Sequence, residues 1–175
     1  MLVFISGGVR SGKSTLGEKL TDDSAIGRKV YLATSIANDE EMANRIRLHQ
    51  EQRKGRGYLT IEKSTGIHEI TTDLLPGDTV LLDCLGNLLA NEMFIDENTL
   101  RTADIVDNIF LSIKEINDKV ENLIIISNDV FSDGCMYSDS VVEYIDALAA
   151  LHIRIAGISD KAIECVFGNA VAHKT

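Results

Sequence analysis

Residues 7–14, Gly-Gly-Val-Arg-Ser-Gly-Lys-Ser, form a glycine-rich loop between an apolar run at residues 2–6 and a helical pattern at residues 13–20. They match the pattern G-x-x-x-x-G-K-S/T at every fixed position. In such a loop the glycines let backbone N–H groups turn toward a phosphate, and the N-terminus of the following helix adds its own N–H groups and dipole. The loop therefore predicts a nucleoside triphosphate site in which Lys13 contacts the β- and γ-phosphates and Ser14 coordinates Mg²⁺.

The charge balance excludes several other ligands. The chain has 27 acidic and 17 basic side chains, which gives a formal net charge of −10. A field of this sign does not attract nucleic acid or an anionic membrane surface, so neither is expected as a partner. An anionic ligand must instead be held by a local site such as the glycine-rich loop, whose groups act at short range.

The alternation of apolar runs and helical patterns predicts the fold class. The chain has 175 residues, a length typical of one domain, so we expect a single domain over residues 1–175. Strands are expected at residues 2–6, 29–33, 58–61, 79–82, 123–127 and 153–156, and helices at 13–20, 38–53, 65–75, 85–94, 100–120 and 141–151. This order predicts an α/β protein with a mostly parallel sheet and helices on both faces. We predict no element beyond residue 159.

A triphosphate site of this kind also needs a carboxylate for the metal. Asp83 directly follows the apolar strand at 79–82, which is typical of the acidic residue that assists the loop. Asp129, after the strand at 123–127, is a rival, and Asp83 could instead cap the next helix. The odd number of cysteines, without metal-ligand spacing, argues against structural zinc or a disulfide framework. It favours a reduced, cytoplasmic compartment, and no apolar run is long enough to cross a membrane.

A polar stripe marks the helix expected at residues 38–53. Glu41, Arg45, His49 and Arg53 are four residues apart and share one helix face. The simpler interpretation is a solvated charge ladder. In the alternative, the two arginines favour the neutral imidazole of His49 by lowering its pKa, which makes it a nucleophile, while their guanidinium groups hold phosphate oxygens.

Several motifs together resemble a known family. They are the loop at 7–14, Tyr-Leu-Ala-Thr-Ser at 31–35, Asp-Glu-Glu-Met at 39–42 with the arginine–histidine stripe, and Leu-Asp-Cys-Leu at 82–85. This combination is similar to the bifunctional adenosylcobinamide kinase/adenosylcobinamide-phosphate guanylyltransferases and covers roughly residues 1–130. Residues 127–131 and the segment after residue 158 depart from the family pattern, and a late helix between residues 137 and 153 is expected to be short or missing.

The resemblance implies a RecA-like P-loop fold, a homotrimer, and two reactions. ATP or GTP phosphorylates the hydroxyl of adenosylcobinamide, and GTP then donates GMP to that phosphate through a guanylylated His49. Mg²⁺ is implied at Ser14 and Asp83. The implied nucleotide contacts are Gly7, Gly8, Val9, Arg10, Ser11, Gly12, Lys13, Ser14, Thr34, Ser35, Ile36, Gln50, Glu51, Gln52, Arg53, Glu62 and Asp83.

Two other functions remain open at this point. The P-loop alone is also compatible with a small-molecule kinase of another pathway, which would transfer phosphate without a covalent nucleotide. It is equally compatible with a non-catalytic GTP-binding protein. The remaining histidines have no metal-ligand spacing and are expected to be structural or peripheral: His68 at the surface, His152 at the start of the strand 153–156, and His173 in a mobile tail.

Overall fold

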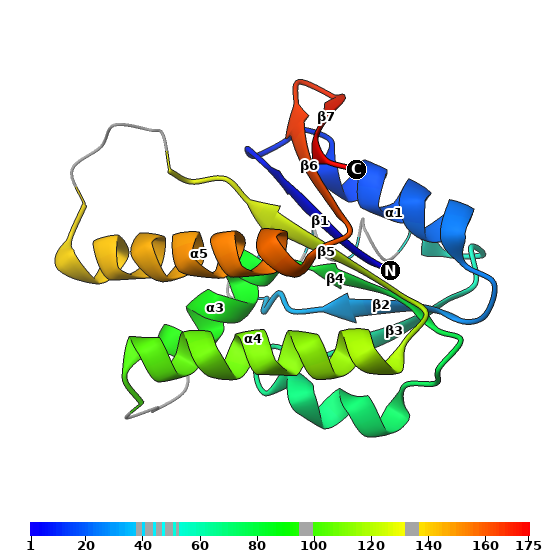
Figure 1. The fold of residues 1–175 in the computed structure, drawn as a ribbon, viewed down its shortest axis with the longest axis horizontal. Helices are drawn as coiled ribbons and strands as arrows, with labels where there is room; N and C mark the ends of the chain where they lie inside the picture. Colours follow the sequence, from blue (N-terminus) through cyan, green and yellow to red (C-terminus); the bar gives the residue numbers. More distant parts are fainter. Residues whose placement is uncertain are drawn as a thin grey trace.

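The computed structural model describes residues 1–37, 40, 44, 47, 51, 53–94, 100–131 and 137–175. These residues form one seven-stranded sheet in the order β3-β2-β4-β5-β1-β6-β7 (Figure 1). Each neighbouring pair of described strands is parallel except β6 and β7, which confirms the mostly parallel sheet. The strands are β1 (Leu2–Gly7), β2 (Lys29–Ala33), β3 (Tyr58–Glu62), β4 (Thr79–Asp83), β5 (Asn122–Asn128), β6 (Lys161–Val166) and β7 (Asn169–Lys174).

Helices cover both faces of the sheet. On one face α1 (Lys13–Ser24) packs against β1, β4 and β5 (Figure 1). On the other face α3 (Leu85–Phe94), α4 (Thr102–Lys119) and α5 (Asp139–Ile158) form a layer, with the 3₁₀ helix η1 (Ile67–Asp73) against α4. None of the helices in the described ranges combines the length and apolar character that crossing a bilayer requires.

Each strand of the sheet contributes to two cores because its side chains alternate between the faces. In β1, Leu2 and Phe4 belong to the larger core beneath α3, α4 and α5, whereas Val3 and Ile5 belong to the smaller core beneath α1. The strand is hydrophobic throughout because both faces are covered. This burial fixes the carboxyl end of β1, where the glycine-rich loop begins.

The segment predicted as helical at residues 65–75 is a helix of the 3₁₀ type, η1, which is shorter than predicted at both ends. The hydroxyls of Thr71 and Thr72 donate to the carbonyls of His68 and Glu69, three residues earlier, at 2.6 and 3.2 Å. Two consecutive threonines disfavour an α-helix, and their side chains here bond to the backbone of a tighter turn. Pro76 then follows and prevents the segment from extending.

The strand predicted at residues 153–156 was wrong, because these residues continue α5 to Ile158. Leu148, Leu151 and Ile155 are fully buried at helical spacing, whereas Ile153 is 75% exposed. The alternating isoleucines therefore lie on opposite sides of a helix. The same helix contradicts the expectation of a short or missing late helix, since α5 spans 20 residues.

The chain after residue 159, for which no element was predicted, forms the β6–β7 hairpin. β6 pairs with β1 in parallel, so β1 lies between β5 and β6. His173 lies in β7, where its imidazole is 2.9 Å from Glu164 Oε2, and not in a mobile tail.

His152 lies on α5, not at the start of a strand, and is largely buried against the sheet. Its Nε2 is 2.7 Å from the hydroxyl of Ser127, and its ring meets Phe4 and Phe131 edge-on at 4.9 and 5.1 Å between centroids. Burial lowers the pKa of His152 to about 4, against a weaker opposing effect from Asp129. The imidazole is therefore neutral in the folded protein at neutral pH.

This neutral histidine should make the fold sensitive to acid. Well above pH 6.5 neither the folded nor the unfolded state protonates His152, and its contribution is complete. As the pH falls toward 4, the unfolded chain binds a proton that the folded chain does not, which lowers the free energy of unfolding by about 2.5 kcal/mol at pH 4.5. We expect His152→Gln to remove this part of the loss, measured by urea unfolding at pH 7 and 4.5. Identical pH dependence in both proteins would contradict the assignment.

Candidate functional site

The glycine-rich loop joins the carboxyl end of β1 to the first residue of α1. Gly12, with φ +96°, adopts a left-handed conformation that favours glycine. The Ser11 N–H donates to the Gly8 carbonyl at 3.2 Å, and the Lys13 ammonium donates to the same carbonyl at 3.1 Å. The loop is thus closed on itself, with the lysine folded over it and the N-terminus of α1 directed at the enclosed space.

The carboxyl ends of β2, β3, β4 and β5 lie at the edge of the sheet where the glycine-rich loop begins. Ala33 of β2 is in register with Glu62 of β3 and with Asp83 of β4, and Gly7 of β1 is in register with Asn128 of β5. Ligands of open parallel sheets bind outside these carboxyl ends. The strand order therefore brings Glu62, Asp83 and Asn128 to the same edge as the glycine-rich loop.

Asp83 is held by Tyr31 from the neighbouring strand. The Tyr31 hydroxyl donates to Asp83 Oδ2 at 2.9 Å, and burial together with this carboxylate raises the pKa of the phenol far above its usual range. The carboxylate is thus oriented by a donor that stays protonated, and its second oxygen remains for a further interaction.

Arg53 stacks on the face of the Tyr31 ring. Its guanidinium carbon is 3.4 Å from the centroid of Tyr31, and the residue is 6% exposed. Its Nη1 is 3.7 Å from Glu18 Oε1, close enough for attraction but too long for a hydrogen bond. Within the described residues neither Nε nor Nη1 of Arg53 has a hydrogen-bond partner. A buried cation with unused donors favours an anionic ligand beside it.

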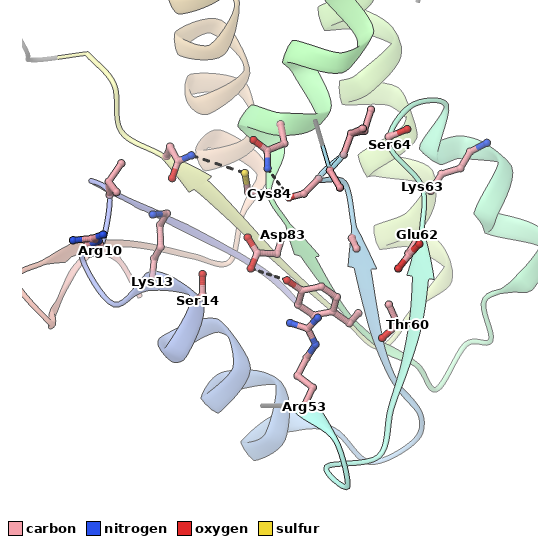
Figure 2. A pocket seen from close by; sticks show the side chains of 18 residues that line it. Arg10, Lys13, Ser14, Arg53, Thr60, Glu62, Lys63, Ser64, Asp83 and Cys84 are labelled. Carbon is pink, nitrogen blue, oxygen red and sulfur yellow. Dashed lines mark hydrogen bonds between the residues drawn. The ribbon is translucent and has the colours of Figure 1, made fainter. Parts of the chain in front are cut away.

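These groups enclose a pocket of about 580 Å³ (Figure 2). Figure 2 shows Lys13 and Ser14 on one side, Asp83 in the middle, and Thr60 and Glu62 on the far side. The lining residues are Val9, Arg10, Lys13, Ser14, Tyr31, Ala33, Ser35, Ile36, Ala37, Arg53, Thr60, Glu62, Lys63, Ser64, Asp83, Cys84, Asn87 and Asn128.

The pocket brings together about half of the residues that the sequence predicted. The predicted residues that line it are Val9, Arg10, Lys13, Ser14, Ser35, Ile36, Arg53, Glu62 and Asp83. Gly7, Gly8, Ser11 and Gly12 form the loop itself. Asp129, the rival of Asp83, is not among the lining residues. Its side chain accepts from the Phe131 N–H at 3.2 Å.

Other predicted residues lie elsewhere. Thr34 is fully buried behind the pocket, where its hydroxyl donates to the Cys84 carbonyl and accepts from the Cys84 N–H, both at 2.8 Å. Glu51 is exposed and paired with Arg47 at 3.3 Å. His49, Gln50 and Gln52 lie outside the described residues, so their assignments stay predictions, and so does the stripe that contains Glu41 and Arg45.

Sequence reasoning did not single out several pocket residues. Tyr31 belongs to the motif at 31–35 but was not assigned to the site, and Asn87 and Asn128 were not assigned to it either; all three reach the pocket through strand order and the start of α3. Asn87 donates to the Ser35 hydroxyl at 2.7 Å. Cys84 also lines the pocket, and burial raises the pKa of its thiol to about 12. The thiol is therefore protonated at neutral pH.

The residues present fit a magnesium ion that is shared with a nucleotide. In the described ranges, no three His, Cys, Asp or Glu side chains are grouped to hold a metal by themselves. Ser14 and Asp83 offer one hydroxyl and one carboxylate oxygen to the same pocket. Mg²⁺ commonly takes one or two such protein ligands and completes its shell with water and phosphate oxygens.

A family model decides the relationship of this chain to known proteins. The model described as "Cobinamide kinase / cobinamide phosphate guanyltransferase" (CobU) matches residues 3–172. This chain belongs to the CobU family. The match extends beyond residue 130, where the resemblance in the sequence ended, and includes α5, β6 and β7 as far as residue 172. These C-terminal elements are thus part of the CobU fold.

One curated relative in this family is "Bifunctional adenosylcobalamin biosynthesis protein CobU" of Escherichia coli (strain K12). It is 38% identical over 95 residues, which are 54% of this chain and 51% of the relative. The chain thus spans about half the length of the curated relatives it matches.

Solved structures show the fold class. A type III secretion system ATPase of pathogenic bacteria aligns with a TM-score of 0.53 and 14% identity, over 98% of this chain and 56% of that one. The RadB recombinase aligns with a TM-score of 0.51 and 13% identity, over 93% and 73%. This CobU-family chain therefore has a RecA-like fold, as predicted.

Proposed function

We propose that this chain catalyses both reactions named by its family: phosphorylation of adenosylcobinamide by a nucleoside triphosphate, and transfer of GMP from GTP to adenosylcobinamide phosphate. One observation carries the proposal. A single pocket joins Lys13 and Ser14 of the glycine-rich loop to Arg53 and Glu62, which the resemblance assigns to the guanine nucleotide. Adenosylcobinamide is the proposed corrinoid substrate. The proposed oligomeric state is a homotrimer and the proposed location is the cytoplasm. The free, buried Cys84 and Cys165 support a reduced compartment.

In the phosphoryl-transfer step, the substrate hydroxyl attacks the γ-phosphorus and the nucleoside diphosphate leaves. Lys13 and the N–H groups of the glycine-rich loop stabilise negative charge on the transferred and departing oxygens. Asp83, oriented by Tyr31, is directed at the same space. Mg²⁺ held by Ser14 and Asp83 would neutralise phosphate charge when bound.

In the guanylyl-transfer step, a ring nitrogen of His49 attacks the α-phosphorus of GTP, and the bond to the bridging oxygen breaks to release pyrophosphate. A phosphate oxygen of adenosylcobinamide phosphate then attacks the same phosphorus and the P–N bond breaks. Two displacements replace one more difficult step. Arg53, with its unused N–H groups, would hold phosphate oxygens.

The covalent intermediate gives the decisive test. After incubation with GTP labelled at the α-phosphate and Mg²⁺, we expect an acid-labile, base-stable label on the protein. His49→Ala should remove roughly 95% or more of this label, because the phosphoramidate cannot form without the imidazole nucleophile. His68→Ala is the matched control, since His68 is exposed on η1, and it should keep the label.

The outcomes separate the proposal from its rivals. Transfer of the γ-phosphate to an acceptor, without any α-phosphate label on the protein, would contradict guanylyl transfer. That result would favour a kinase of another pathway. Binding of GTP without label, nucleoside diphosphate or pyrophosphate would favour a non-catalytic GTP-binding protein. Adenosylcobinamide should be the best acceptor when hydroxyl compounds are compared for ADP production.

A further inference from the structure

Phe167 lies in the turn of the β6–β7 hairpin, in a backbone conformation that is unfavourable for phenylalanine. Val166 pairs with Asn169, so Phe167 and Gly168 form a two-residue turn, with φ of +48° and +81°. Turns with two positive φ values favour asparagine, aspartate or glycine at the first position, and an aromatic residue there is strained. The side chain is also 94% exposed and contributes almost nothing to packing. Neither local conformation nor the core explains a phenylalanine at this position.

The turn is attached to the glycine-rich loop. The Gly168 N–H donates to the Ser11 carbonyl at 2.9 Å, and a β-carbon added at Gly12 would lie 3.5 Å from Gly168 Cα. Further down the strands, Gly7 is in register with Cys165, whose carbonyl would be 2.7 Å from a β-carbon at Gly7. Figure 1 shows the hairpin beside the start of α1. Phe167 is therefore fixed next to the phosphate-binding loop by backbone contacts.

Strand order gives Phe167 a direction relative to the pocket. The pocket extends from the loop across β5, β4, β2 and β3, and none of the described residues of β6 or β7 lines it. The hairpin lies on the other side of β1. A nucleotide seated on the loop thus has one end over the pocket and the other toward the hairpin.

The two proposed reactions need opposite ends of the nucleotide in the pocket. For phosphoryl transfer the γ-phosphate must face Asp83 and the acceptor, so the nucleoside leaves the loop on the side of β6. We propose that Phe167 is a stacking platform for the purine base of the nucleoside triphosphate that donates its γ-phosphoryl group. In guanylyl transfer the α-phosphate faces the pocket, and the guanine lies there instead. This inference rests on the phosphoryl-transfer half of the proposed function.

Stacking on an aromatic ring suits this position because every purine has a π-face, and no hydrogen-bond partner is needed. It also predicts which nucleotides are accepted. Phe167 should serve adenine and guanine alike, because stacking does not discriminate between them as hydrogen bonds would.

A fluorescent variant tests the contact directly. The chain contains no tryptophan, so Phe167→Trp introduces a single reporter. The non-hydrolysable ATP analogue AMP-PNP with Mg²⁺ should quench its emission, and tripolyphosphate with Mg²⁺, which lacks a base, should not. Ile26→Trp, at a 91% exposed position between α1 and β2, is the matched control and should not respond to either ligand. Equal responses to AMP-PNP and tripolyphosphate, or no response to bound AMP-PNP, would overturn the proposal.

Kinetics give a second, independent readout. Phe167→Ala should raise the KM for ATP in phosphoryl transfer. This rise should be roughly 5- to 30-fold larger than any rise in the KM for GTP in guanylylation. Phe167→Asn should weaken ATP binding similarly while raising Tm, because asparagine tolerates the left-handed turn. An equal effect on both reactions would overturn the assignment to the phosphoryl donor. If the wild-type protein fails to phosphorylate adenosylcobinamide, the proposed function fails, but the fluorescence experiment needs no turnover and still decides the contact.

Discussion

Replacing Lys13 with methionine should lower the rates of both proposed transfers roughly 100- to 1000-fold, the range found when one preorganised donor is removed from developing charge. The Lys13 ammonium is largely buried over the glycine-rich loop. Both reactions expel a phosphate-bearing leaving group from this loop, so one cation serves both. Initial rates of ADP and pyrophosphate release, measured with saturating adenosylcobinamide or its phosphate, test the expectation.

The Lys13 variant should remain folded. The Gly8 carbonyl, which accepts from Lys13, also accepts from the Ser11 N–H at 3.2 Å and so keeps a partner. Lys19→Met is the matched control on the same helix: its side chain is 72% exposed and pairs with Asp23. It should leave both rates unchanged. A Lys13→Met protein with an unaltered Tm and rates within threefold of wild type would contradict the assigned role.

Replacing Asp78 with alanine should lower the free energy of unfolding by about 2 kcal/mol, because it removes a buried carboxylate that accepts three hydrogen bonds, two of them from a charged group. The Asp78 carboxylate is almost fully buried before β4. It accepts from Arg28 Nε at 2.9 Å, from Arg28 Nη2 at 2.6 Å and from the Leu75 N–H at 2.8 Å. These bonds hold the pKa of Asp78 below its usual range. Urea unfolding at pH 7 measures the loss.

A surface pair of similar length provides the comparison for Asp78. Arg154 donates to Asp107 at 2.6 Å, but the Asp107 side chain is 60% exposed. Asp107→Ala should therefore cost less than about 1 kcal/mol. Equal losses for the two aspartates would show that burial does not decide their contributions. Because Asp78 is at the amino end of β4, away from the pocket, its variant should keep its nucleotide affinity below the unfolding transition.

The parts of the fold that could be predicted are those with two-sided burial or strong helical spacing. β2 and α3 were predicted with the bounds that the structure has, residues 29–33 and 85–94. β7, by contrast, is exposed along its whole length and has no hydrophobic pattern to detect. Residues 153–156 were misassigned because Ile-Arg-Ile-Ala alternates like a strand, while the burial of Leu151 and Ile155 follows the helix.

The candidate site shows a similar division. Lys13, Ser14 and Asp83 could be proposed because each follows directly from a strand–loop–helix or strand–acid pattern. Tyr31 could not, because its hydrogen bond to Asp83 joins residues that are 52 positions apart and depends on the pairing of β2 with β4. Arg53 was proposed as a phosphate ligand. Its stacking on Tyr31 follows only from packing in three dimensions.

The position of β1 between β5 and β6 has a consequence for protein synthesis. Of the seven described strands, β1 leaves the ribosome before the others, yet its neighbours lie more than 110 residues later in the chain, at Asn122–Asn128 and Lys161–Val166. Until both have emerged, the phosphate-binding segment has no flanking strands and no hairpin against which to close. A nascent chain should therefore acquire its affinity for nucleotides only after Lys161–Val166 has emerged, long after the residues that contact the phosphates have been made.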